Sequence, residues 1–265
     1  MKLLSLLTAL ILSFPISLAS RQTTSSPSTS STQAATLLTQ SSAALTGLVV
    51  VNDVTLTGRA EWIAGSDDET GSATCKAVAS ANRLDLALSN GTRSEIRSST
   101  SGVPSGTWIG PDGVSHAMAD HNLMSDPGWF PAFALGNLIS SSSTVLTYIG
   151  QETRNGASVI HISATQQFPS LSGSAASLMQ HLTQVDLYLD PATLLPVFYV
   201  FNSHADNNAS LDIPTEIRYS NYQNIGGTKI PLHVQKFINN DLAIDLQFQN
   251  AYLNTGLTAA QISAQ

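Results

Sequence analysis

The sequence predicts an α+β fold that is mostly antiparallel β: one large curved sheet, a sandwich or a barrel, with helical segments available to fill its trough. Many short segments alternate between apolar and polar residues, which is the pattern of strands with one buried face. Asn-Gly and related turn residues separate these segments at the spacing of hairpins. Residues 120–140 are apolar without alternation. Since a sheet of about ten to twelve twisted strands curls into a trough, the helical segments are expected to fill or cover it.

The length and charge of the chain limit the number of domains and the kinds of partner that we expect. Its 265 residues are enough for one large β-rich domain, which we place over residues 34–265. The 11 Lys and Arg residues against 18 Asp and Glu residues give a formal charge of -7. An acidic chain without a basic cluster argues against a nucleic-acid partner, because phosphate binding needs concentrated Lys and Arg. It also argues against electrostatic docking on anionic lipid.

The N-terminal residues 1–19 have the features of a secretory signal peptide. Lys2 precedes an apolar run over residues 3–14, and residues 17–19 (SLA) form a small-x-small cleavage site. No cysteine follows the cleavage site as a lipid anchor, and the lone Cys75 cannot form an internal disulfide. Residues 20–33, rich in Ser and Thr, are expected to be a disordered linker. We therefore expect a periplasmic or secreted protein of a bacterial envelope.

The first half of the domain is expected to be one helix followed by strands. Leu37, Leu38 and Leu45 share one stripe of a helix over residues 34–45, and Gly47 ends it. Alternation predicts strands over residues 48–64, 72–79, 83–88 and 92–98, then a hairpin of residues 108–109 and 114–118.

The segment over residues 120–140 is the candidate lid, with its apolar part running from Leu123 to Ile139. Pro127 and Pro131 interrupt it, so short helices are expected rather than one long helix. Ordinary core packing of a helix on a sheet explains the same apolar residues about equally well. The Pro127-Gly128 pair favours a broken, movable segment slightly.

The second half of the domain returns to strands. Strands are predicted over residues 144–151 and up to 166, then 185–189 and 197–201, with a short helix over residues 174–182 and a polar loop over residues 203–212. An antiparallel meander over residues 215–255 follows, with turns at residues 224–227 and 239–241, where Asn and Gly tolerate positive φ. A short helix or turn over residues 257–262 ends the domain.

Two turn motifs in the second half carry a family resemblance. Residues 185–197 (VDLYLDPATLLPV) contain a strand, an Asp-Pro-x-Thr turn and a Leu-Pro entry to the next strand. Residues 219–231 contain two tyrosines three apart, a turn and a G-x-K-x-P strand entry. Together with the order of elements, these motifs resemble the LolA-like superfamily of periplasmic lipoprotein carriers and lipid-binding envelope proteins. The resemblance implies a large curved sheet in the form of an unclosed β-barrel, with a helical lid over an apolar cavity. It implies binding of acyl chains or another lipid, without chemistry. It also implies an arginine in the cavity that holds the lid; Arg59 and Arg83 lie in early strands, and neither is assigned that role.

Residue patterns typical of catalysis or metal binding are weak. Ser115 lies in Gly-Val-Ser-His-Ala, which lacks the last Gly of a nucleophile elbow and sits in a hairpin. The group His116, Asp120, His121 and Asp126 lacks the four-residue spacing that aligns two metal ligands on a helix. The other histidines are scattered singly, and Cys75 has the setting of a buried inert thiol. We therefore expect no catalytic residue, no cofactor and no metal.

The leading hypothesis is a soluble exported protein, expected to be a monomer, that binds a lipid or the acyl chain of an acylated protein and contacts envelope membrane proteins transiently. A non-catalytic structural or interaction protein of the envelope is the first alternative, and a secreted hydrolase using Ser115 or His116 is the second. The candidate residues lining the cavity are Leu84, Leu86, Leu88, Leu123, Trp129, Phe130, Phe133, Leu232, Val234, Ile244, Leu246 and Phe248.

Overall fold

The structure is a computed structural model that describes residues 29–47, 49–100 and 102–263. The predicted signal peptide and residues 20–28 of the predicted linker lie outside the described residues. Among the helices that are described, none has the length and apolar character needed to cross a membrane.

The described residues form four α-helices, one 3-10 helix and thirteen strands. The helices are α1 (Thr29–Thr46), η1 (Asp120–Leu123), α2 (Pro131–Ser140), α3 (Gly173–Leu182) and α4 (Ala259–Ser263). The strands of the first half are β1 (Asp53–Ala64), β2 (Asp67–Val78), β3 (Ala81–Leu88), β4 (Gly91–Thr100), β5 (Val103–Ile109) and β6 (Ser115–Ala117). The strands of the second half are β7 (Thr144–Arg154), β8 (Ala157–Gln166), β9 (Val185–Leu189), β10 (Pro196–Ala205), β11 (Asn208–Ile225), β12 (Thr228–Ile238) and β13 (Asp241–Leu253).

All thirteen strands belong to one antiparallel sheet in the order β6-β5-β4-β3-β2-β1-β13-β12-β11-β10-β9-β8-β7. The sheet is curved and does not close, because β6 and β7 remain as edges. These two edge strands are consecutive in the chain, so the segment that joins them must pass from one edge to the other. That segment contains η1 and α2, the predicted lid, broken into two short helical pieces as its prolines indicate. The predicted fold class is confirmed.

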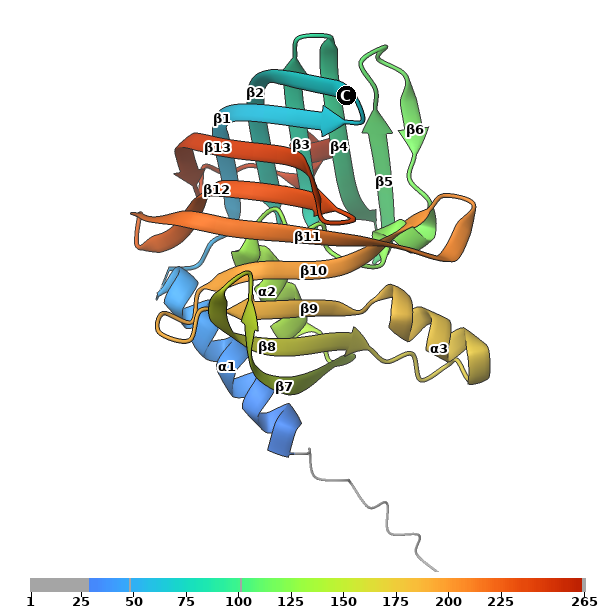
Figure 1. Cartoon of the computed structure of the whole chain (residues 1–265), viewed down its shortest axis with the longest axis vertical. Helices are drawn as coiled ribbons and strands as arrows, with labels where there is room; N and C mark the ends of the chain where they lie inside the picture. The colour runs from blue at the N-terminus through green and yellow to red at the C-terminus, as the bar shows by residue number, and fades with distance from the viewer. Residues whose placement is uncertain (1–28, 48, 101, 264–265) are drawn as a thin grey trace, which may run out of the picture.

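Helices α1 and α2 pack together against one half of the sheet, and β1 to β5 extend beyond them (Figure 1). Ala34, Leu38 and Leu45 are fully buried, at the spacing of one helical face. The helix begins at Thr29, so the prediction of disorder is wrong over residues 29–33. Packing of α1 on β7, together with a hydrogen bond from Ser30 Oγ to the Tyr148 carbonyl oxygen at 2.9 Å, extends the helix beyond its sequence signal.

The predicted meander is present as β11, β12 and β13, and its two turns lie where the sequence places them. Asn239 and Asn240 adopt φ of 51° and 70°, and Gly226 and Gly227 also have positive φ. The predicted polar loop over residues 203–212 is wrong, because β10 and β11 continue through it as a hairpin. Residues 208, 210, 211 and 212 of this hairpin are exposed, so no apolar alternation marks its tip as a strand.

Asp53 ties the start of β1 to the end of β13. Its carboxylate accepts hydrogen bonds from the Thr255 amide and hydroxyl, each at 2.9 Å, and from the Gly256 amide at 2.9 Å. Burial raises the pKa of Asp53, but these donors outweigh burial and hold the pKa below its ordinary value.

Replacing this carboxylate is expected to weaken the join between the two strands. Asp53→Asn should lower the free energy of unfolding by about 1–3 kcal/mol at pH 7, since three donors lose a charged acceptor. A carboxylate with a depressed folded pKa stabilises the fold above its unfolded pKa and loses that effect as pH falls through the folded pKa. Urea titrations should therefore show the difference from the wild type shrinking below about pH 4. Asp68 is exposed, so the control variant Asp68→Asn should change the free energy of unfolding little at either pH. If Asp53→Asn lost the same stability at every pH, the stabilising role assigned to the Asp53 carboxylate would be contradicted.

Candidate functional site

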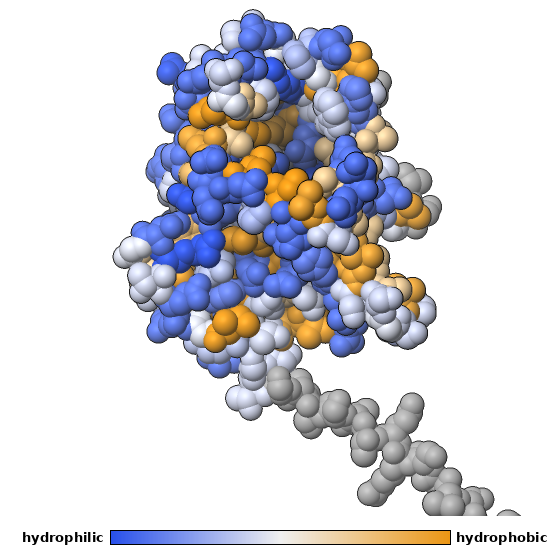
Figure 2. Space-filling model, turned by 45° about the vertical axis from the view of Figure 1, so that its right-hand side comes forward, coloured by the Kyte–Doolittle hydropathy of each residue, from blue (hydrophilic) through white to orange (hydrophobic). Residues whose placement is uncertain are grey.

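An apolar cavity of about 380 Å³ lies on the concave face of the sheet, in the half that α1 and α2 leave uncovered. Figure 2 shows the upper part of the molecule hollowed, with hydrophobic residues along the walls of the hollow. The cavity is lined by Trp62, Leu84, Leu86, Arg93, Ser94, Glu95, Trp108, Ile109, Gly110, Pro111 and Ile244. A volume this large is many times that of a single water and lies within the range of about 300–1,000 Å³ typical of ligand sites.

One wall of the cavity carries charge. In β4, Arg93 and Glu95 stand opposite Leu86 and Leu84 of β3, so their side chains share the concave face. The Arg93 guanidinium pairs with Glu69 at 2.7 Å and stacks over the Trp62 ring, 3.9 Å from its centroid. The cavity therefore combines apolar walls with one arginine that is already held by an ion pair and a tryptophan.

A cluster of charged side chains lies beneath this cavity. Arg97 pairs with Glu95 at 2.8 Å, and Lys236 of β12 is close enough to interact with both charges. Burial raises the pKa of Glu95, but the charges of Arg97 and Lys236 outweigh burial and lower it. Burial lowers the pKa of Lys236 and raises the pKa of Asp126, which accepts a hydrogen bond from the Gly128 amide at 2.8 Å.

Arg97 joins this cluster to the lid. Its guanidinium donates to the carbonyl oxygen of Asn122 at 2.9 Å and to that of Ser125 at 3.1 Å. Asn122 is held in turn by the His204 backbone, because its side-chain amide donates to the carbonyl oxygen and accepts from the amide nitrogen, each at 2.8 Å. The lid segment from η1 to Ser125 is thus fastened to the sheet at two places, one at Arg97 of β4 beneath the cavity and one at the end of β10.

The remainder of the lid fills the other half of the trough. Trp129 is 2 % exposed and Phe130 is 7 % exposed, and both belong to the main hydrophobic core. Tyr219 donates a hydrogen bond to the Gly128 carbonyl oxygen at 2.5 Å. Only about 10 Å³ remains between Trp129, Phe133 and the strands there, which is roughly enough for one water. The part of this half around Trp129 and Phe133 is packed core, as the alternative explanation of the lid predicts, whereas Ala134, Asn137 and Leu138 of α2 border a separate cavity of about 190 Å³.

The predicted lining residues are divided among four surroundings. Leu84, Leu86 and Ile244 line the large cavity. Leu123 lines a second cavity of about 190 Å³ beside Arg97 and Asp126. Trp129, Phe130 and Phe133 border the narrow gap under α2, and the last group lies in the core or packs against it: Leu88, Leu232, Val234, Leu246 and Phe248.

Sequence reasoning places Trp62 on the apolar face of the strand over residues 48–64 but does not include it among the candidate lining residues. It missed five further residues of the concave face: Arg93, Glu95, Arg97, Trp108 and Lys236. The available signal was the alternation of Arg93, Glu95 and Arg97 along β4, which places all three on one side of the strand. Of the arginines considered for the lid, Arg59 is exposed, and Arg83 pairs with Asp85 at 2.7 Å.

The candidate catalytic groups do not assemble into a recognisable active site among the described residues. Ser115 stands opposite Ile109 in the short β5–β6 ladder and is exposed. The neighbouring His116 ring stacks on the indole of Trp108, with ring centroids 4.0 Å apart. Cys75 is buried in the core, and burial raises the pKa of its thiol, which makes it a poor nucleophile.

An open antiparallel sheet with a broken helical lid across its concave face is a LolA-like fold, and solved structures bear this out. The chain matches a domain assigned to outer membrane lipoprotein sorting in Vibrio parahaemolyticus, with a TM-score of 0.56, 12% identity and coverage of 88% of this chain and 97% of that chain. It also matches a LolA superfamily protein from Nitrosomonas europaea, with a TM-score of 0.52, 12% identity and coverage of 87% and 97%. A DUF1329 family protein from Desulfovibrio piger gives a TM-score of 0.55, 8% identity and coverage of 88% and 97%. No protein-family model and no curated protein sequence matches the chain. At these identities the likeness shows the fold alone.

Proposed function

We propose that this protein binds the acyl chain of a lipid or of an acylated protein in the cavity between β1, β3, β4, β5 and β13. The observation that carries the proposal is the cavity itself, about 380 Å³ with walls formed by Trp62, Leu84, Leu86, Trp108 and Ile244. A structural protein whose sheet is filled by its own helices would leave no such space. Burial of about ten methylene groups would contribute on the order of 8 kcal/mol before entropy costs.

The segment over residues 120–140 acts as the lid in this proposal, and Arg97 holds it. Lid residues, among them the buried Trp129, fill the trough next to the open cavity and line the second cavity of about 190 Å³, so a long chain that extends past the open cavity must displace the lid. Arg97 lies at that boundary, with Glu95 on the cavity side and the carbonyl oxygens of Asn122 and Ser125 on the lid side. Ligand entry would therefore break contacts between the lid and the sheet, those of Arg97 first, and would leave the strand pairing of the sheet intact.

The proposed setting is the bacterial periplasm or the exterior of the cell, with transient contact to membrane proteins that deliver or receive the ligand. The predicted signal peptide over residues 1–19 supports export. The likeness to a lipoprotein-sorting domain and a LolA superfamily protein supports a carrier role over a catalytic one.

Lipid binding can be tested on the purified protein. Organic extraction should recover co-purified lipid or fatty acid, and the delipidated protein should bind a fluorescent fatty-acid probe. Ile244→Trp places a larger side chain in the cavity wall, so probe affinity should fall about tenfold or more, as expected when space for several methylene groups is lost.

A matched variant separates this effect from a general effect of the added indole. Ile149→Trp makes the same change at a residue of β7 that is 53 % exposed, away from the cavity, and its probe affinity should equal that of the wild type. Absence of lipid from the extract together with no probe binding to the wild type would exclude the proposed function.

A further inference from the structure

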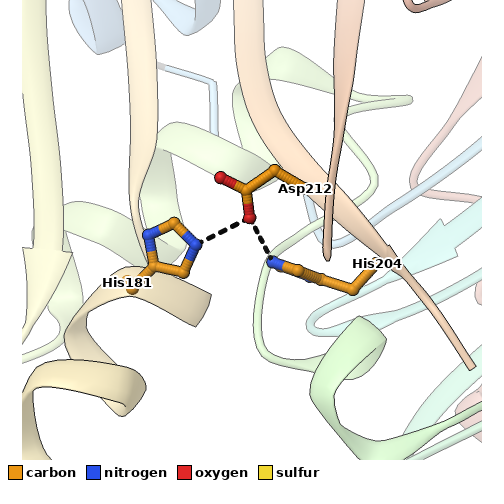
Figure 3. A group of neighbouring side chains, drawn as sticks. All are labelled: His181, His204 and Asp212. Carbon is orange, nitrogen blue, oxygen red and sulfur yellow. Dashed lines mark hydrogen bonds and ion pairs between the residues drawn. The ribbon is translucent and has the colours of Figure 1, made fainter. Parts of the chain in front are cut away.

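Three side chains from separate elements converge at the outer end of the β10–β11 hairpin. His181 lies in the last turn of α3, His204 in β10 and Asp212 in β11. His204 and Asp212 are directly opposite each other in the ladder, so their side chains are neighbours across the two strands. Figure 3 shows both imidazole rings directed toward the same carboxylate.

The distances among these groups are those of a small ligand set. The Oδ1 atom of Asp212 is 2.8 Å from His181 Nε2 and 3.2 Å from His204 Nε2. All three donor atoms lie within 4.8 Å of one another. A tetrahedral metal with ligands at about 2.0–2.1 Å separates its donor atoms by about 3.3 Å, so small side-chain rotations bring the three atoms around one ion.

We propose that His181, His204 and Asp212 bind a divalent transition-metal ion of the zinc type. Two neutral imidazoles and one carboxylate are a ligand set that zinc takes in proteins, with a water molecule at the fourth position. In the part of the chain that the structure describes, this is the one group of three such side chains whose donor atoms meet. The proposal departs from the sequence analysis, which treats His181 and His204 as isolated residues.

The burial and charge of the group fit a metal site that is reached from one side. The His204 side chain is 1 % exposed, whereas those of His181 and Asp212 are 38 % and 42 % exposed, so an ion can enter from solvent onto a buried ligand. The Nδ1 atom of His204 is buried without a hydrogen-bond partner, and Asp212 is the one acidic group beside its Nε2.

The site lies next to the contact between Asn122 of the lid and the backbone of His204. The backbone of His204 holds the Asn122 side chain, and His121 of η1 lies with its ring 5.9 Å from that of His204 and its Nε2 3.1 Å from the Ala205 carbonyl oxygen. A metal on His204 and Asp212 would therefore fix the strand end to which the first part of the lid is fastened.

Zinc alone is the probe for the test. After treatment with a chelator and its removal, the purified protein should bind one equivalent of Zn²⁺ in a calorimetric titration, and Co²⁺ in its place should give the visible absorption of a tetrahedral site. His181→Ala and Asp212→Asn should each weaken zinc binding by more than the 10–100-fold that loss of a mere outer-shell partner costs. The side chains of His181 and Asp212 are both partly exposed, so both variants should keep the wild-type circular dichroism spectrum.

The matched control is His233→Ala, which removes a histidine from another His–Asp pair. His233 Nε2 is 2.9 Å from Asp245 Oδ2, on a different part of the sheet. This variant should bind zinc as the wild type does. Failure of the wild type to bind zinc stoichiometrically, or wild-type affinity in both His181→Ala and Asp212→Asn, would overturn the proposal and leave the group as a hydrogen-bonded His–Asp–His cluster.

Discussion

Arg97→Met is expected to loosen the lid and to destabilise the fold by about 3 kcal/mol. The change leaves Glu95 without its closest cation in a buried site, and breaking one side of a buried ion pair typically costs about 3–5 kcal/mol. Lys236 remains near Glu95 and offsets part of that cost. The carbonyl oxygens of Asn122 and Ser125 lose their donor at the same time, so hydrogen exchange should become faster over residues 120–128 than over the sheet.

Arg59→Met is the matched control for this prediction, because Arg59 is also a strand arginine but is exposed. Its urea midpoint and its exchange pattern should remain those of the wild type. If Arg97→Met unfolds at the wild-type urea concentration and exchanges no faster in residues 120–128, then Arg97 does not hold the lid.

Trp129→Ala is expected to cost about 3–5 kcal/mol of stability, the range for removing a buried tryptophan from a core. Trp129 is 2 % exposed and lies between the lid and the sheet, with the Lys236 ammonium 5.5 Å from its ring centroid. Its loss should leave a cavity under α2, which would join the packed half of the trough to the open half. Urea denaturation should give the stability change, and a fatty-acid probe should report whether the added space admits a longer chain.

Trp108→Ala makes the same substitution at the rim of the open cavity, where the side chain is 41 % exposed. Its effect on stability should stay within about 1 kcal/mol, since little area is withdrawn from water there. Equal losses of stability in the two variants would contradict the assignment of Trp129 to the core.

The sheet could be predicted because its signals are local. Asn239, Asn240, Gly226 and Gly227 mark turns by backbone conformations that few other residues tolerate, and the strands between them alternate in side-chain burial. The prediction failed at residues 203–212 because both faces of that hairpin tip are largely exposed, so the physical cause of alternation is missing there.

The site was harder to predict because its important residues depart from the pattern of an apolar interior. The charged residues of β4 do not mark an inward face by hydrophobicity, yet Arg93, Glu95 and Arg97 face inward and are neutralised by Glu69, by one another and by Lys236. The group of His181, His204 and Asp212 forms only in the folded protein. Strand pairing places His204 opposite Asp212, and α3 packs back against the sheet beside them, so the spacing of these residues in the sequence does not predict the group.

The seam between β1 and β13 has a consequence for how the protein folds. Strands β1 to β6 follow one another from the middle of the sheet to one edge, and strands β7 to β13 follow one another from the other edge to the middle. The two meanders therefore pair with each other only where β1 meets β13, with Val54 opposite Leu253. Each meander consists of neighbours in sequence and can form with short loop closures, whereas the seam closes a loop nearly as long as the domain. We expect the two halves to form first and the seam to form last, so a chain synthesised from its N-terminus cannot complete its sheet until the last strand has been made.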